Sequence, residues 1–180
     1  MKYFSKLLGS AVFSALLIGA PLLAQDVNVD YDHTADFKRM TTYSWQKIHA
    51  TDPQVEERIS AAVNRNLVNL GFNTVDKNPD LLITVVDVTK NPREYGSFYA
   101  SLKGFNWRRG WGSKGFSDTA RTVQQIPLGT LVFDLYDGKT HQLLWRATVD
   151  EAVAKSSDKN SLVLDKVIGE MLDQFPKNEK

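Results

Sequence analysis

Two alternating segments joined by a short connection constrain the fold of this chain most strongly. Large apolar side chains occupy every second position on both sides of the connection: Leu131, Phe133, Leu135, Leu143, Trp145, Ala147 and Val149. A period of two is typical of half-buried β-strands. Asp137-Gly138 lies between the segments and indicates a tight turn in which glycine supplies a positive φ. The sequence therefore predicts a β-hairpin over Gly129–Val149.

The odd numbers of these core candidates restrict the register of the hairpin. Directly paired residues point to the same face of a sheet, so the numbers of two paired core residues must add to an even total. Pairing Phe133 with Trp145 across a loop at Asp137–His141 meets this condition. We expect both rings in one core.

The remaining periodic segments complete an α+β fold. Further strands are expected at 27–31, 41–45 and 81–89, and the last is apolar on both faces, which favours the sheet interior. Helices are expected at 53–70, between a cap at Asp52 and a stop at Gly71, and at 161–175. The predicted order is β-β-α-β-(long loop)-β-β-α, a mainly antiparallel sheet with two helices packed on one face.

The N-terminal segment has the pattern of an export signal. Lys2 and Lys6 precede an apolar run that ends near the small residue Ala24, which predicts a signal peptide over 1–24 with cleavage after Ala24. An uncleaved membrane anchor is the alternative, and Pro21 argues against it. Cleavage leaves a single domain at 25–176 with a tail at 177–180.

Composition limits which cellular compartment and which partners are expected for the chain. The signal carries two lysines and no acid, so 22 basic residues become 20 against 21 acidic ones in the mature chain. A charge near zero does not steer a protein to nucleic acid. Cysteine is absent, so the chain has no disulfide, no thiolate nucleophile and no lipidation site. We expect an unlipidated periplasmic protein with no span after cleavage.

A long segment rich in aromatic and basic residues interrupts the periodic pattern at 93–125. We call it the aromatic-basic segment, and its candidate partner-binding residues are Tyr95, Phe98, Tyr99, Trp107, Arg108, Arg109 and Trp111. Aromatic and arginine side chains can stack on rings or face a membrane interface, and long aperiodic connections are usually functional or disordered. The alternative is an extended β-hairpin whose aromatic side chains cap the domain's own sheet.

No catalytic or metal-binding spacing accompanies this segment. Asp26, Asp30, Asp32 and Asp36 could offer oxygen ligands to a cation, but their alternation with apolar residues also fits a solvated strand face. The three histidines lack the spacing of a helical zinc motif, and no serine lies in a nucleophile elbow. We therefore expect no metal, no cofactor and no catalytic residue. Asp137 and Arg146 are expected to serve the turn and a surface ion pair.

Several short motifs resemble a known family. Val29-x-Tyr31-Asp32, Thr42-Tyr43-x-Trp45, Pro79-Asp80-Leu81, Gly129-Thr130-Leu131 and Leu144-Trp145-Arg146 are similar to DUF4136, a bacterial envelope family of unknown function with many lipoproteins. The resemblance implies an envelope location and an α+β fold, and it assigns no catalytic residue. The sequence thus favours a non-enzymatic domain that binds an envelope protein, glycan or lipid. An envelope glycan- or lipid-modifying enzyme and a self-packed structural or stress-related protein are the alternatives.

Overall fold

The computed structural model describes residues 27–50, 52–88, 92–107, 129–150 and 161–176. Its strands are β1 (Val27–Tyr31), β2 (Thr42–His49), β3 (Asn73–Thr74), β4 (Leu81–Val88), β5 (Thr130–Asp137) and β6 (Leu143–Val149). Its helices are α1 (Pro53–Asn69), α2 (Pro92–Ser101) and α3 (Ser161–Asp173), with a 3-10 turn at Phe37–Arg39. The predicted signal peptide and the tail at 177–180 lie outside the described residues.

The strands form one mixed sheet in the order β1-β6-β5-β4-β2-β3. Neighbouring strands from β1 to β4 run antiparallel, whereas β2 runs parallel to both β4 and β3. The α+β fold and the interior position of β4 are confirmed. The parallel pair was not expected. The parallel pairing arises because α1 returns the chain to the end of the sheet where β2 begins. Parallel neighbours require such a crossover connection.

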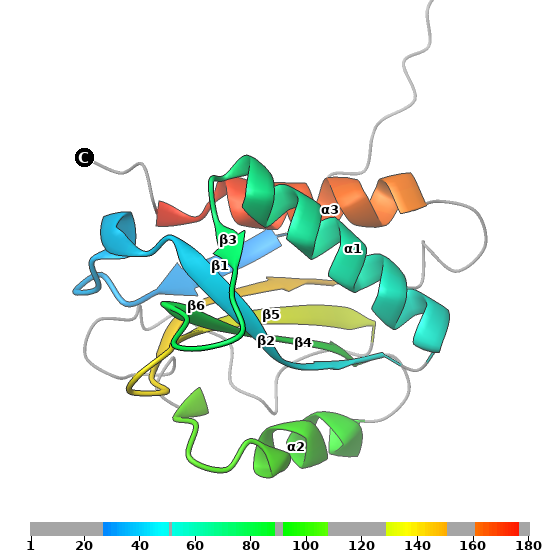
Figure 1. Cartoon of the computed structure of the whole chain (residues 1–180). Helices are drawn as coiled ribbons and strands as arrows, with labels where there is room; N and C mark the ends of the chain where they lie inside the picture. The colour runs from blue at the N-terminus through cyan, green and yellow to red at the C-terminus, as the bar shows by residue number, and fades with distance from the viewer. Residues whose placement is uncertain (1–26, 51, 89–91, 108–128, 151–160, 177–180) are drawn as a thin grey trace, which may run out of the picture.

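Helices cover both faces of the sheet (Figure 1). α1 and α3 lie on one face, which confirms the predicted pair, while α2 lies on the opposite face. Pro92–Ser101 was expected to belong to a long loop, so the helix there is a correction. Its buried residues Tyr95, Phe98 and Tyr99, with Leu102 just beyond it, follow the i, i+3, i+4, i+7 spacing of one helix face.

The hairpin packs its two large rings as expected but in a different register. Phe133 and Trp145 are both 0% exposed, and their ring centroids lie 5.4 Å apart at 83°. Phe133 pairs with Ala147, and Trp145 pairs with Leu135, so the predicted direct pairing is wrong by two residues. The two rings are diagonal neighbours in a shared core. An irregularity next to Leu144 also moves Leu143 to the other face, where it packs with Tyr136.

Gly138 is required for a reason other than the one expected. Its φ is not positive, and the left-handed residue of this connection is His141, with φ of 55°. A Cβ atom at Gly138 would lie 1.9 Å from the carbonyl oxygen of Pro79. The turn therefore needs glycine because the chain before β4 lies directly against it. Asp137 serves the turn as expected, since its Oδ1 accepts bonds from the backbone of Lys139 and Thr140.

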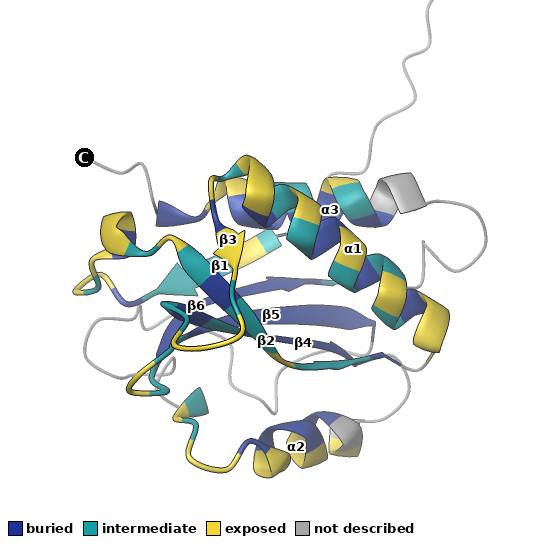
Figure 2. Cartoon of the chain, in the orientation of Figure 1, coloured by how far each residue is buried: buried dark blue, intermediate teal, exposed yellow. Residues whose placement is uncertain are grey.

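The boundaries of α1 confirm the sequence signals at both ends. Asp52 accepts a hydrogen bond from the Gln54 amide at 2.8 Å, as an N-cap does. Gly71 adopts φ of 82°, and the Phe72 amide donates to the Leu67 carbonyl at 2.9 Å, which is a Schellman motif. The buried side of α1 faces the sheet and its other side is exposed (Figure 2).

Candidate functional site

A charged pair lies buried on the face of the sheet that α2 covers. Asp134 on β5 and Arg146 on β6 are direct cross-strand partners. Arg146 donates from Nε to Asp134 Oδ1 and from Nη2 to Asp134 Oδ2, both at 2.5 Å. Arg146 is only 6% exposed, so the expected surface pair is wrong. The hairpin strands are expected to be half-buried, but in the structure both of their faces are buried.

Two tyrosine hydroxyl groups complete the surroundings of this carboxylate. Tyr99 of α2 donates to Asp134 Oδ2 at 2.6 Å, and Tyr136 of β5 donates to the same oxygen at 3.0 Å. The Arg146 guanidinium also lies 5.4 Å from the Tyr99 ring centroid, and its Nη2 is 3.4 Å from the Tyr99 hydroxyl. We call Tyr99, Asp134, Tyr136 and Arg146 the buried cluster. It joins the helix to two central strands.

Electrostatics keep the tyrosines of this region neutral and the arginine charged. Burial, reinforced by the negative charge of Asp134, raises the pKa of Tyr99 and of Tyr136 well above 10. Burial raises the pKa of Tyr95 to about 12, although the Arg146 charge opposes the shift. Burial lowers the pKa of Arg146, but the charge of Asp134, its hydrogen bond to Arg146 and the nearby Tyr95 and Tyr99 together more than offset burial, so the pKa of Arg146 is raised. The hydroxyl groups therefore act as donors at neutral pH and not as nucleophiles.

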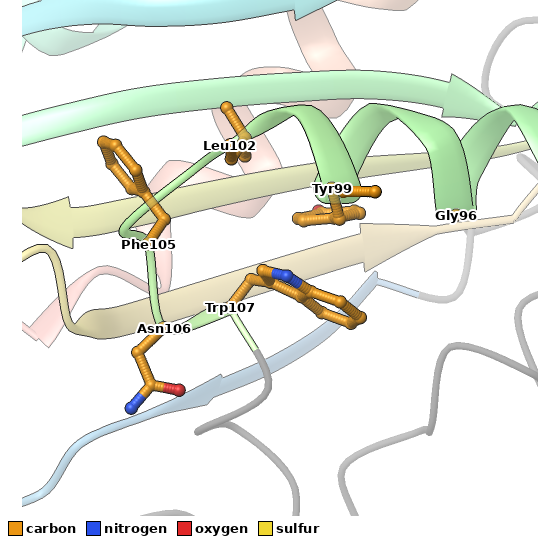
Figure 3. A pocket seen from close by; sticks show the side chains of 7 residues that line it. Gly96, Tyr99, Leu102, Phe105, Asn106 and Trp107 are labelled. Carbon is orange, nitrogen blue, oxygen red and sulfur yellow. The ribbon is translucent and has the colours of Figure 1, made fainter.

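An aromatic hollow opens beside the buried cluster, where α2 ends. Its volume is about 430 Å³, and it is lined by Gly96, Tyr99, Ala100, Leu102, Phe105, Asn106 and Trp107. Figure 3 shows the Tyr99 and Trp107 side chains next to one another, with Asn106 directed away from them. The two ring centroids lie 5.1 Å apart at 38°. The volume falls within the range of small-molecule sites.

Residues of the β5–β6 hairpin contact Phe105 and Asn106, two of the side chains that line the hollow. Phe105 stacks on His141 with centroids 4.4 Å apart and planes 3° apart, and it meets the Tyr136 ring edge-on at 5.0 Å. Asn106 Nδ2 donates to Gln142 Oε1 at 2.9 Å. None of the seven described residues that line the hollow carries a charge. The described lining offers aromatic faces and the amide of Asn106, and so suits an uncharged ligand.

The predicted binding residues divide into three groups. Tyr95, Phe98 and Tyr99 lie on the buried side of α2, and Trp107 is half-buried at the hollow. Arg108, Arg109 and Trp111 lie outside the described residues, as does most of the aromatic-basic segment. The expected extended hairpin is wrong where the chain is described, because the segment begins as a helix. The binding role of these residues stays a prediction.

Sequence reasoning did not identify Leu102, Phe105 and Asn106 as parts of the site, and it missed the buried pair. The helical spacing from Tyr95 to Leu102 was a usable signal for α2 and for the side that it buries. The alternation of the two strands does not by itself mark Asp134 and Arg146 as buried, because a charged residue on a strand normally indicates a solvated face.

The described aspartates and histidines considered earlier have local structural partners, whereas Asp26 lies outside the described residues. Asp32 Oδ1 accepts from the Thr34 amide at 2.9 Å, and His33 packs on the Tyr31 ring at 4.1 Å. His49 lies 3.6 Å from Glu56. Among the described residues, no group of three or more potential ligands could hold a metal ion. No helix in that part of the chain is both long and apolar enough to cross a membrane.

Comparison with known proteins gives a family and a shared fold. Residues 27–177 match the family described as Domain of unknown function (DUF4136). A crystal structure of a DUF4136 family protein from Bacteroides thetaiotaomicron is similar, with a TM-score of 0.58 and 14% identity, over 85% of this chain and 96% of that one. At this identity the likeness shows the fold alone. No curated protein matches the chain.

Two other structures are more distant. A PDZ domain protein from Parabacteroides distasonis has a TM-score of 0.49 and 16% identity, over 87% of this chain and 37% of that one. A PelC dodecamer from Paraburkholderia phytofirmans has a TM-score of 0.45 and 10% identity, over 82% and 94% of the two chains.

Proposed function

We propose that this chain, which belongs to the DUF4136 family, is an exported, non-enzymatic domain that binds an envelope glycan through the aromatic hollow. The observation that carries the proposal is the hollow whose described lining is uncharged and includes Tyr99 and Trp107. Aromatic rings offer an apolar face to the C–H groups of a sugar ring, and amide side chains offer donors and acceptors to its hydroxyl groups.

The charge of the chain favours a glycan over a lipid headgroup. Recognition of an anionic lipid surface usually requires four to eight clustered basic residues. The described lining of the hollow contains no basic residue, and the predicted mature chain has a net charge of −1. The N-terminal pattern of two lysines followed by an apolar run supports export, and the absence of cysteine supports an unlipidated form.

The chemistry of the buried cluster argues against an enzyme acting on the same polymer. Asp134 already accepts two bonds from Arg146 and one from each of two tyrosines, so its oxygens are occupied. A glycosidase needs two carboxyl groups that flank the scissile bond. The seven described residues that line the hollow include neither an aspartate nor a glutamate.

One observation favours a second candidate, a self-packed structural protein of the envelope. Tyr95, Phe98 and Tyr99 are each at most 3% exposed, so three of the five aromatic residues proposed for binding stabilise the domain itself. In that case the hollow would have no ligand, and the aromatic side chains would serve to hold α2 on the sheet.

Co-sedimentation separates these two functions. The full chain, purified after export, is mixed with purified peptidoglycan sacculi or with phosphatidylglycerol vesicles. We expect it to sediment with sacculi only. Trp107→Ala should weaken this binding about tenfold, since loss of one aromatic stacking partner costs about 1–3 kcal/mol. Val68→Ala is the control, because Val68 is an exposed apolar residue on α1, across the sheet. Binding to neither material by a folded protein would support the structural candidate, and binding to vesicles alone would contradict the glycan.

A further inference from the structure

Tyr99 belongs both to the hollow and to the buried cluster. Its ring lines the hollow beside Trp107, while its hydroxyl group reaches Asp134 in the interior. The position of the ring is therefore fixed at its far end by a group that a ligand in the hollow does not touch. Loss of the hydrogen bond to Asp134 would free the Tyr99 ring, which lines the hollow, to change its position.

The bonds around Asp134 leave the Tyr99 hydroxyl one well-defined position. Asp134 is held by the bidentate contact with Arg146, whose side chain comes from the neighbouring strand. A bidentate charged pair restricts the orientation of its two side chains more than a single neutral hydrogen bond does. The guanidinium also lies over the Tyr99 ring, so Arg146 restrains both the hydroxyl group and the ring plane.

Stability alone is a poor explanation for this pair. Replacing a buried ion pair with apolar residues of similar volume is often neutral or stabilising, because both charges lose their hydration. An apolar cluster already lies between this face of the sheet and α2. In it, Val86, Val88 and Val132 of the sheet pack with Phe98 of α2 and with Leu102 just beyond the helix. That cluster can hold the helix in place but cannot set the direction of the Tyr99 hydroxyl group.

We propose that Asp134 and Arg146 are positioning residues for the binding hollow, and that they act through Tyr99 on Trp107. The inference rests on the proposed function for its biological meaning. The structural part of the inference does not depend on that function: the pair fixes the orientation of the Tyr99 ring, and this ring fixes the position of the Trp107 indole, whose centroid lies 5.1 Å from it.

Fluorine NMR of the 5-fluorotryptophan-labelled full chain tests this coupling directly. The chain has four tryptophans, and Trp107→Phe identifies the resonance of Trp107. Tyr99→Phe keeps the ring and removes the bond to Asp134 together with the 3.4 Å bond from Arg146 Nη2. We expect it to shift or broaden the Trp107 resonance, to leave that of Trp145 in the other core unchanged, and to weaken sacculus binding at least threefold. Asp134→Asn should have the same effects where the variant folds.

Tyr136→Phe is the matched control. It removes the hydroxyl group that donates to the same oxygen of Asp134, but Tyr136 lies on β5 and not on α2. It should destabilise the chain to a similar extent and leave Trp107 in place. A Trp107 resonance that is unchanged in Tyr99→Phe, or displaced equally in Tyr136→Phe, would overturn the inference. A displaced Trp107 in a protein that never binds sacculi would support the positioning role and refute the proposed function instead.

Discussion

Replacement of Arg146 with methionine should destabilise this fold more than most single substitutions. The change leaves the Asp134 carboxylate in a buried site with two tyrosine donors and no cation. Breaking a buried pair in this way costs about 3–5 kcal/mol. That is a large part of the roughly 5–15 kcal/mol by which a domain is stable. Asp134→Leu should cost at least as much, because it leaves the guanidinium without its carboxylate and also removes the acceptor of Tyr99 and Tyr136.

The double variant separates a buried pair from two independent contacts. An apolar replacement of both partners is neutral or stabilising by about 1–4 kcal/mol, but here Tyr99 and Tyr136 lose their acceptor at about 1–3 kcal/mol each. We therefore expect Asp134→Leu with Arg146→Met to lose about 2 kcal/mol in total. This is less than either single variant loses, and it corresponds to a coupling energy of at least about 4 kcal/mol.

Urea unfolding followed by tryptophan fluorescence measures these differences. With a slope of about 2 kcal/mol per M, a loss of 4 kcal/mol lowers the midpoint by about 2 M. Arg65→Met is the control, because Arg65 pairs with Asp165 while its side chain is 57% exposed. An exposed pair contributes about 0–1 kcal/mol. If Arg146→Met cost no more than Arg65→Met, the pair would not be buried in solution and the reasoning would be refuted.

Three further predictions concern the tyrosines and two glycines. The unfolding free energy should fall above pH 10, because the unfolded chain ionises Tyr95, Tyr99 and Tyr136 near pH 10 while their pKa values are raised in the fold. Each contributes up to about 1.4 kcal/mol per pH unit, so urea midpoints at pH 9, 10 and 11 should decline steeply, and a flat profile would contradict the burial. Gly138→Ala should cost about 1–3 kcal/mol by thermal unfolding, since the new Cβ meets the Pro79 carbonyl oxygen; an unchanged Tm would show that the turn can move. Gly71→Val should cost about 1 kcal/mol or more in the same assay because of its positive φ, whereas equal stability would mean that the end of α1 can unwind without loss.

Local signals in the sequence predicted the elements whose stability is local. The ends of α1 are set by Asp52 and Gly71, and both act within one turn of the helix. The alternation around Phe133 placed its ring and that of Trp145 in one core for a similar reason, because a period of two depends only on neighbouring residues. These predictions needed no information about distant parts of the chain.

Contacts between distant segments account for most of what was missed. Gly138 is needed because Pro79, about sixty positions earlier, passes against it, and no local rule reports such an approach. β2 runs parallel to β4 because of the path of α1, which the order of elements alone does not determine. α2 is different: its helical spacing was present, but Gly96 and Ser97 lower helix propensity, and the glycines and arginines that follow suggested a loop.

The error that concealed the buried pair was a two-residue shift in the hairpin register. Under the expected pairing of Phe133 with Trp145, Asp134 faces Leu144, and Arg146 has no acidic partner across the strand. Under the observed pairing Asp134 faces Arg146, and the two opposite charges meet on one face. Alternation shows that a strand has two unlike faces but not which of them water reaches, because a buried ion pair and a solvated charge have the same period. Complementary charges on facing strands are therefore a useful test between registers of equal parity, and here that test selects the register in the structure.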